Sequence, residues 1–384
     1  MVVRRSFAVV ARRAALAAGA VGACAALTAT AVPATADSAD LGRIGGIELL
    51  DSAWSFDKAA VSLGLTYSTT DQRGNQARAT AGLYLPAGLP PAGGWPLVVW
   101  AHGTIGIGND CAPSHRPQSE RNRNYFNQIL DNGYAVLAPD YQGLGTGGNF
   151  SYYNTAVESR SLLDAVTAAR GLPVPLTGHY VLVGQSEGAH AVMSAAALYA
   201  QNPRYAPGLN GVIATGLRTN PAKSLREMFR SSSTGSDNQV GYAGYYLAAM
   251  EELNPGSVAP YLSEFGREYV EKAATECLSD LVAEAHGRRP AALVADPDRP
   301  TPTFESDIKA LVSYQEKVPA DLMIGYGTAD IDVPPTDTPA YGPALQSRNP
   351  WATVTVNAYP GKDHSGAFLA SLPDALDFLH THLP

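Results

Sequence analysis

Cysteines and basic residues are scarce in this chain, and each shortage argues against a class of protein. Three cysteines occur among 384 residues, and they form neither a C-x-x-C pair nor a His/Cys cluster, so no metal site is expected. The 27 Lys and Arg are outnumbered by 35 Asp and Glu, which gives a net charge of −8. Such an acidic chain is a poor candidate for binding nucleic acid or anionic membranes.

A long apolar run is also missing, apart from an Ala-rich stretch near the N-terminus that is short for a membrane helix. Arginines at 4, 5, 12 and 13 come first, and the small-residue pattern A-x-A follows at 34–36. This order is typical of an export signal, and residues 4–7 partly match a twin-arginine signal. We expect cleavage near Ala36 and a secreted protein with 23 basic and 35 acidic residues, a net charge of −12.

Cleavage of residues 1–36 would leave two cysteines, Cys111 and Cys277. Two cysteines in an exported chain favour one disulfide, which would close a loop of 166 residues. Two unpaired, buried thiols are the alternative. Cys24 could be the lipid-attachment site of a lipoprotein. The apolar run continues past it, however, which favours cleavage of residues 1–36 without lipid attachment.

Short apolar runs alternate with helical patterns through much of the chain. This alternation is typical of a mostly parallel, doubly wound α/β sheet, whose strands are buried on both faces. Residues 71–75 have turn chemistry, and residues 109–124 are polar and expected to form a loop. Strands are expected at 63–69, 79–85, 96–101, 134–139, 180–183, 211–216, 321–326 and 353–358, and helices at 158–170, 189–199 and 367–380.

Residues 217–319 depart from this rhythm because they contain no clear buried strand. Helical patterns are expected there at 222–230, 241–253, 258–274 and 303–314, and the segment 242–250 is apolar and rich in tyrosine. We interpret 217–319 as a helical cap inserted into a core formed by 37–216 and 320–384. A disulfide between Cys111 and Cys277 would then join the core to the cap.

The most informative motif is GQSEG at residues 184–188, between an apolar strand and an Ala-rich helix. The pattern G-x-S-x-G in this context is the nucleophile elbow, in which a strained turn exposes the serine hydroxyl. The two glycines allow the strand and the helix to approach closely around it. Ser186 is therefore the predicted nucleophile, and the helix N-terminus behind it favours developing negative charge.

An acid and a histidine follow the last two strands, in the positions that a catalytic triad requires. Asp330 comes after the strand at 321–326 and is the predicted carboxylate that orients the histidine, with Asp332 as the alternative. His364 comes after the strand at 353–358 and is the predicted general base and acid. The order serine, aspartate, histidine is that of α/β-hydrolases. His380 and His382 are expected to be exposed near the C-terminus.

A small-residue loop follows the strand at 96–101. It reads His102-Gly103-Thr104 and is expected to supply one backbone amide of an oxyanion hole, from Thr104 or from Gly103. The second amide would come from Glu187, directly after the nucleophile. His102 is expected to brace this loop. The glycines at 140–146 lack the lysine of a phosphate-binding loop, which excludes that interpretation.

Several stretches together resemble the secretory lipase family of α/β-hydrolases, from about residue 61 onward. The resemblance is carried by HGT at 102–104, CAPS at 111–114, PDYQGLGT at 139–146, GQSEG at 184–188, GTADIDVPP at 327–335 and DHS at 363–365. The resemblance implies hydrolysis of carboxylic esters, with a cap that shapes the acyl site. The chain departs from the commoner G-x-S-x-G-G pattern in having Ala189, which is also small.

We therefore expect a secreted serine hydrolase that cleaves acyl or lipid esters through an acyl-enzyme, without a cofactor or metal. The expected partner is a small-molecule or lipid ester, with transient contact to a lipid interface compatible with this role and no obligate protein partner evident. A peptidase or amidase, an acyltransferase, and a non-catalytic binding protein on the same scaffold are the alternatives. The sequence leaves open the acyl length, the alcohol group and the oligomeric state.

Overall fold

The computed structural model describes residues 40–233, 235–298, 306, 309–314 and 316–383. The predicted export signal, with Cys24 and the cleavage site near Ala36, lies outside these described residues. Residues 303–305, 307 and 308 of the helix expected at 303–314 also lie outside them, whereas the described residues 309–312 are helical. In the part of the chain that is described, no helix is both long enough and apolar enough to span a membrane.

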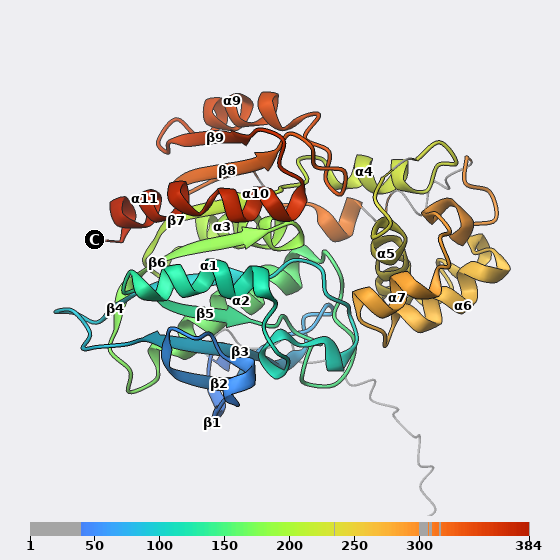
Figure 1. Cartoon of the computed structure of the whole chain (residues 1–384). Coiled ribbons are helices and arrows are strands. Elements are labelled where there is room, and N and C mark those ends of the chain that lie inside the picture. Colours follow the sequence, from blue (N-terminus) through green and yellow to red (C-terminus); the bar gives the residue numbers. More distant parts are fainter. Residues whose placement is uncertain (1–39, 234, 299–305, 307–308, 315, 384) are drawn as a thin grey trace, which may run out of the picture. The chain divides into compact units, whose positions relative to one another are not determined.

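Within the described residues, nine strands form one sheet in the order β1-β2-β3-β5-β4-β6-β7-β8-β9 (Figure 1). The strands β1 to β3 are antiparallel, β3 is antiparallel to β5, and all neighbours from β5 to β9 are parallel. The expected mostly parallel α/β sheet is therefore confirmed. The bounds are β1 Ile44–Leu49, β2 Ala59–Thr70, β3 Gln76–Pro86, β4 Trp95–Ala101, β5 Ala135–Pro139, β6 Leu176–Gln185, β7 Leu209–Thr215, β8 Asp321–Gly327 and β9 Val354–Tyr359.

Helices cover both faces of the sheet (Figure 1). In β4, Leu97 and Val99 pack on the side of α2 and α3, whereas Val98 and Trp100 pack on the side of α1 and α10. Alternate residues of one strand thus enter two hydrophobic cores, which explains the continuous apolar run. The helices on the sheet are α1 Glu120–Asp131, α2 Thr155–Arg170, α3 Glu187–Gln201, α9 Thr338–Arg348, α10 His364–Ala370 and α11 Leu372–His382.

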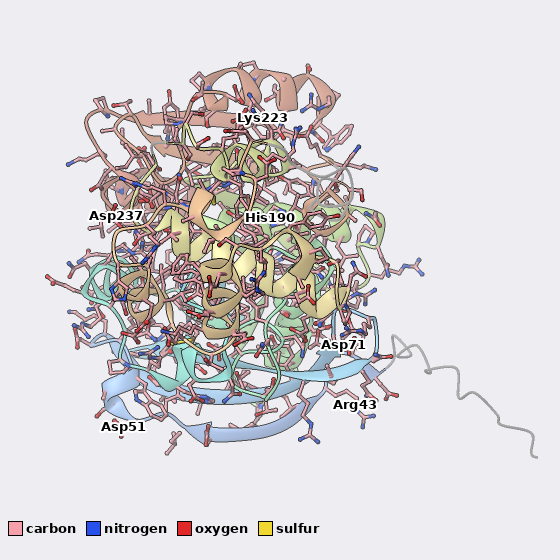
Figure 2. All side chains as sticks on the ribbon, turned by 90° about the vertical axis from the view of Figure 1, so that its right-hand side faces the viewer. Arg43, Asp51, Asp71, His190, Lys223 and Asp237 are labelled. Carbon is pink, nitrogen blue, oxygen red and sulfur yellow. A yellow bond between two sulfur atoms is a disulfide. The ribbon has the colours of Figure 1, made fainter. Side chains whose placement is uncertain are left out.

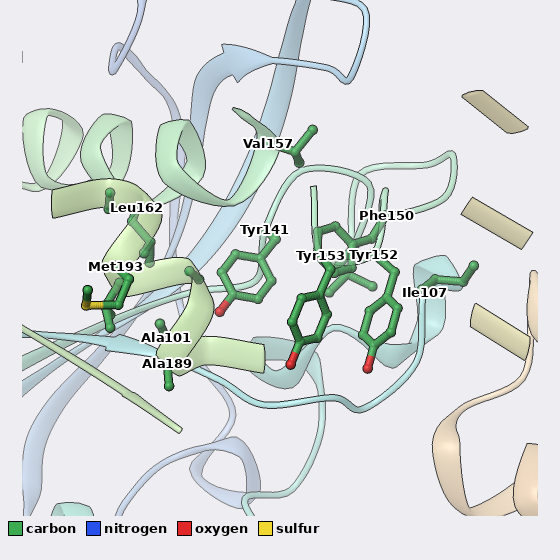
Figure 3. Packing of buried hydrophobic residues seen from close by; sticks show 14 of the residues in the cluster. Ala101, Ile107, Tyr141, Phe150, Tyr152, Tyr153, Val157, Leu162, Ala189 and Met193 are labelled. Carbon is green, nitrogen blue, oxygen red and sulfur yellow. The ribbon is translucent and has the colours of Figure 1, made fainter. Parts of the chain in front are cut away.

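Aromatic side chains from the segment after β5 pack beneath the end of β4. Tyr141 stacks on Phe150 with ring centres 5.1 Å apart, and Tyr152 meets Tyr153 edge to face, also at 5.1 Å. Figure 3 shows these rings in a row beside α3. The Tyr141 hydroxyl donates to the backbone oxygen of His102 at 2.9 Å. This aromatic layer therefore supports the loop that follows β4.

Among the described residues between β7 and β8, the helices are α4 Pro221–Met228, α5 Gln239–Leu253, α6 Glu264–Ala273 and α7 Leu278–Glu284, and residues 309–312 are also helical (Figure 1). The first twelve residues of α5 are all buried, as expected for a helix that is apolar on every side. Figure 2 shows the molecule with the segment 217–319 facing the reader. Lys223 and Asp237 belong to this segment, whereas Arg43 and Asp51 flank β1.

Several expected boundaries were wrong, for identifiable reasons. The loop expected at 109–124 ends early, because Ser119 caps α1 by accepting from the Asn122 amide. The helix expected at 258–274 starts only at Glu264, after a 3₁₀ turn that contains Pro260. The helix expected at 367–380 is two helices, since Pro373 in the first turn of α11 lacks the N–H that a continuing helix needs. The strand β1 and the helices α1, α7 and α9 were not predicted.

Cys111 and Cys277 form a disulfide, with their Cα atoms 5.6 Å apart, so the expected pairing is confirmed in the structure. The bond joins the segment after β4 to the start of α7. Backbone contacts reinforce it: the Leu278 amide donates to the Ile105 oxygen at 2.8 Å, and Gly106 pairs with Cys277. The middle of the segment 217–319 is therefore fastened to the loop beside Thr104.

Loss of this disulfide should lower stability more than it lowers basic activity. We expect Cys277→Ser to reduce the melting temperature, since the chain-entropy estimate for so long a loop is roughly 5 kcal/mol at most. The sheet has its own buried strands, so turnover of short esters at low temperature should survive while chain-length preference changes. Thermal unfolding of wild type with and without reductant provides the check. Two free thiols in freshly secreted protein, found by peptide mapping, would end this explanation.

A buried carboxyl on α2 predicts a pH dependence of stability. The Asp164 side chain is fully buried and accepts from the Tyr205 hydroxyl, and burial raises its pKa to about 6. Because the folded pKa lies above the usual value of 3.8, ionisation destabilises the fold as the pH rises from about 4 through about 6. At a pH above both pKa values, this effect lowers the free energy of unfolding by roughly 3 kcal/mol relative to a pH below both.

The variant Asp164→Asn should remove this ionisation while keeping an acceptor for Tyr205. We expect its melting temperature to fall less than that of wild type between pH 5 and about pH 7.5. Differential scanning calorimetry across this range measures the difference. Parallel curves for the two proteins would show that Asp164 does not titrate in the folded state.

Candidate active site

Ser186 occupies the sharp turn between β6 and α3, with φ 61° and ψ −120°. This positive φ is unusual for a residue with a side chain and is the strained conformation of a nucleophile elbow. A Cβ on Gly184 would lie 2.1 Å from the Gly188 oxygen, and one on Gly188 would lie 1.9 Å from the Ala101 oxygen. The elbow therefore requires both glycines of the motif.

Asp330 and His364 are brought together at the ends of β8 and β9. The Nδ1 atom of His364 lies 2.6 Å from Oδ2 of Asp330, and both side chains are nearly buried. The other carboxylate oxygen, Oδ1, accepts from the amides of Asp332 at 2.9 Å and Val333 at 2.8 Å. These amides fix the carboxylate, which in turn orients the imidazole ring.

Ser186 and His364 line one cavity of about 590 Å³. The Nε2 atom of His364 is buried and has no hydrogen-bond partner within the described part of the chain. Gly216 has φ +64°, and a Cβ there would lie 2.8 Å from Cε1 of His364, so this glycine makes room for the ring. The imidazole thus presents an unoccupied nitrogen in the cavity of the nucleophile.

Asp332, the alternative carboxylate, contacts a different set of groups. Its Oδ1 atom accepts from the hydroxyls of Ser236 and Tyr242, the latter at 3.3 Å. Its backbone oxygen accepts from Arg218 at 3.2 Å. Asp332 lines the cavity but does not bond to His364, so the geometry favours Asp330 as the histidine's partner.

The loop after β4 passes close to Ser186. A Cβ added to Gly103 would lie 3.3 Å from the Cβ of Ser186, so the chain approaches closely there. The Thr104 hydroxyl is held by the Tyr152 hydroxyl at 2.6 Å. Glu187 begins α3, where the first amides of a helix have no partner in the helix itself. These amides and those of the loop flank Ser186, the arrangement expected for an oxyanion hole.

His102 braces the loop, as expected from the sequence. Its two ring nitrogens lie 2.9 Å from the backbone oxygen of Gly103 and 3.3 Å from that of Asp140. Burial lowers the pKa of His102, which keeps the ring neutral. Asp140 also accepts from the hydroxyls of Ser114 and Thr80, so it joins the CAPS and PDYQGLGT stretches.

The Glu187 side chain points into the protein interior and was not predicted to matter. It is fully buried, and burial together with nearby Glu158 raises its pKa well above the usual range. Glu158 pairs with His190 at 2.7 Å, and both are completely buried. The raised pKa favours the neutral form of Glu187, which would not oppose an oxyanion held by the amide of this residue.

The histidines near the C-terminus differ from each other. His380 is exposed, as expected. His382 is half-buried instead, because its ring stacks on Phe378 at 4.0 Å and bonds to Asp321 at 3.1 Å. Among the described residues, no three His, Cys, Asp or Glu side chains are grouped in a way that could hold a metal ion.

Comparison with known proteins agrees with this geometry. Residues 119–298 match the family described as secretory lipase. Candida antarctica lipase A in its closed state has a similar structure, with a TM-score of 0.71 and 18% identity over 89% of this chain and 82% of that one. The esterase LipA of Xanthomonas oryzae, described as degrading rice cell walls, has a TM-score of 0.69 and 17% identity over 89% and 98%. No curated protein matches by sequence.

A putative hydrolase of Legionella pneumophila is also similar, with a TM-score of 0.69 and 17% identity over 84% of this chain and 88% of that one. At such identities the solved structures establish the α/β-hydrolase fold, and the family match covers the segment from α1 through α7. The elbow motif lies within that matched segment. Together, the family match over residues 119–298 and the fold support a secretory lipase family of α/β-hydrolases and the activity of a carboxylic ester hydrolase.

Proposed function

We propose that the protein is a secreted serine hydrolase that cleaves carboxylic esters through a Ser186–His364–Asp330 triad and an acyl-enzyme. One observation carries the proposal: the Asp330–His364 pair presents a free Nε2 in the cavity that also contains the strained Ser186 elbow. This combination of nucleophile, oriented base and adjacent helix N-terminus is the constellation needed for acyl transfer.

In the proposed mechanism, Nε2 of His364 takes the proton of the Ser186 hydroxyl as the oxygen attacks the ester carbonyl. Asp330 holds the ring and stabilises the imidazolium that forms. His364 then protonates the leaving alcohol, and an ester of Ser186 remains. Water, deprotonated by His364, attacks this acyl-enzyme and releases the acid and the free serine.

Backbone amides would stabilise the negative charge on the carbonyl oxygen. Glu187 supplies one from the start of α3, and Thr104 or Gly103 supplies the other from the loop after β4. The aromatic support of that loop through Tyr152 and Tyr141 keeps these donors fixed before the substrate arrives. Pre-organised donors of this kind contribute much of the rate enhancement in acyl transfer.

The segment 217–319 is proposed to act as a cap over the site, because Asn238, Tyr242 and Leu278 from this segment line the cavity. The substrate would be a small-molecule or lipid ester. The family match supports export, and the sequence pattern at 1–36 supports cleavage near Ala36. The acidic net charge supports neither nucleic acid nor an anionic membrane as a partner.

A series of p-nitrophenyl esters from acetate to palmitate, run beside matched p-nitroanilides, tests this function. We expect clear ester turnover, much slower amide turnover, and a preference set by the volume of the cavity. Adding a primary alcohol distinguishes a hydrolase from an acyltransferase, because an acyltransferase would form the transesterification product in preference to the free acid. Absence of turnover with all of these substrates would favour a binding protein on the same scaffold.

A further inference from the structure

The proposed active-site cavity is lined by two arginines whose hydrogen-bond acceptors are all neutral within the described chain. Arg121 lies in the first turn of α1, and Arg116 lies just before that helix. The Arg121 guanidinium donates to the Asn122 side chain at 3.2 and 3.3 Å and to Oε1 of Gln185 at 3.4 Å. Arg116 donates to the sulfur of Cys277 at 2.7 Å.

Arg121 lies between the elements that carry the nucleophile and the base. Gln185, which it contacts, directly precedes Ser186. Its guanidinium also lies over the ring of Phe368, 5.3 Å from the centroid, and Phe368 is one helical turn beyond His364. Burial lowers the pKa of Arg121, although an arginine stays protonated.

Little negative charge faces this position. Asp332 is the only acidic residue among the described residues that line the cavity, and its Oδ1 atom is engaged by two hydroxyls. Ser119 at the start of α1 and Asn238 at the start of α5 also line the cavity, so two helix N-termini add positive potential. In a chain with an excess of acids, this cavity is locally positive.

We propose that the cavity selects esters that carry a carboxylate, and that Arg121, assisted by Arg116, determines this specificity. The inference rests on the ester hydrolysis proposed above. A guanidinium presents parallel donors that match the two oxygens of a carboxylate, and such charge-assisted pairs are about twice as strong as neutral hydrogen bonds. Binding would give the half-buried Arg121 the counter-charge that the free protein lacks.

The carboxylate could belong to the acyl group or to the alcohol, and two substrate pairs distinguish these sources. The acyl pair is mono-(4-nitrophenyl) adipate and 4-nitrophenyl hexanoate. The alcohol pair is 4-acetoxybenzoate and its methyl ester. Each pair differs by one charge near the ester, and rates are corrected with Ser186→Ala. We expect kcat/KM for the anionic member of at least one pair to exceed that of its neutral partner by about ten-fold or more.

The variant Arg121→Gln should reduce this anionic-to-neutral ratio about ten-fold, and Arg121→Lys should retain part of it because the charge remains. The matched control is Arg123→Gln. It removes the same charge from the same helix, but Arg123 bonds to the Gln118 backbone oxygen at 2.7 Å and does not line the cavity. This control should leave the ratio unchanged.

The outcomes separate the two proposals. If the neutral esters are turned over as fast as the anionic ones in both pairs, the proposed carboxylate preference is wrong, whereas the proposal of ester hydrolysis is unaffected. A preference that survives both Arg121→Gln and Arg116→Gln would also overturn it, because the selectivity would then arise elsewhere. No Ser186-dependent turnover of any of the four esters would contradict ester hydrolysis itself, and with it this inference.

Discussion

Ser186→Ala is expected to fold like wild type and to lose ester turnover by a factor on the order of 10⁶. Alanine keeps the Cβ and can occupy the same strained turn, so the elbow and the sheet are preserved. The lost hydroxyl is the group that would form the acyl-enzyme, and water attacking directly lacks the advantage of a held nucleophile. Steady-state hydrolysis of a short p-nitrophenyl ester by purified protein, with circular dichroism as the folding check, measures the effect.

A neighbouring serine supplies the control for this experiment. Ser365 lines the same cavity next to His364 but has no assigned role in acyl transfer. Ser365→Ala should therefore retain most of the turnover. Near-normal activity of Ser186→Ala in protein free of wild-type contamination would remove the nucleophile from the proposed mechanism.

The second large effect concerns the two acids after β8. Asp330→Asn should lower turnover by a factor on the order of 10⁴, because an amide beside Nδ1 favours the wrong tautomer of His364 and does not stabilise the imidazolium. Asp332→Asn keeps an acceptor for the Ser236 and Tyr242 hydroxyls and should cost far less. Measuring kcat for both variants under one set of conditions gives the ranking. If Asp332→Asn is the more damaging change, the triad carboxylate has been assigned to the wrong residue.

Each residue of the proposed triad has a local signature in the sequence. Ser186 lies in a glycine-flanked turn between a strand and a helix, and the close contacts around Gly184 and Gly188 show why that spacing is required. Asp330 and His364 each follow a parallel strand, and the carboxyl ends of parallel strands meet at one edge of the sheet. Sequence order and strand position were therefore enough to bring distant residues together.

The cavity wall was harder to predict, because its residues have no pattern of their own. The polar residues at the start of α1 suggested a loop, although Ser119, a favoured N-cap residue, followed by the acidic Glu120 was a helix-start signal that could have located the helix and Arg121. The side chain of Glu187 gave no hint that it is buried, since charged residues are usually exposed. The position of His382 near the C-terminus suggested that its side chain is exposed. It is half-buried instead, because its ring packs against Phe378.

The most direct test of the central claim is covalent labelling with a 4-nitrophenyl alkylphosphonate, followed by peptide mass spectrometry. Such a reagent reacts with a serine that an adjacent histidine activates and leaves a stable adduct. The account predicts one phosphonate per protein, located on Ser186, with loss of ester turnover in proportion to labelling and no labelling of Ser186→Ala. Full loss of activity with the label on another residue, or undiminished activity with Ser186 labelled, would contradict it.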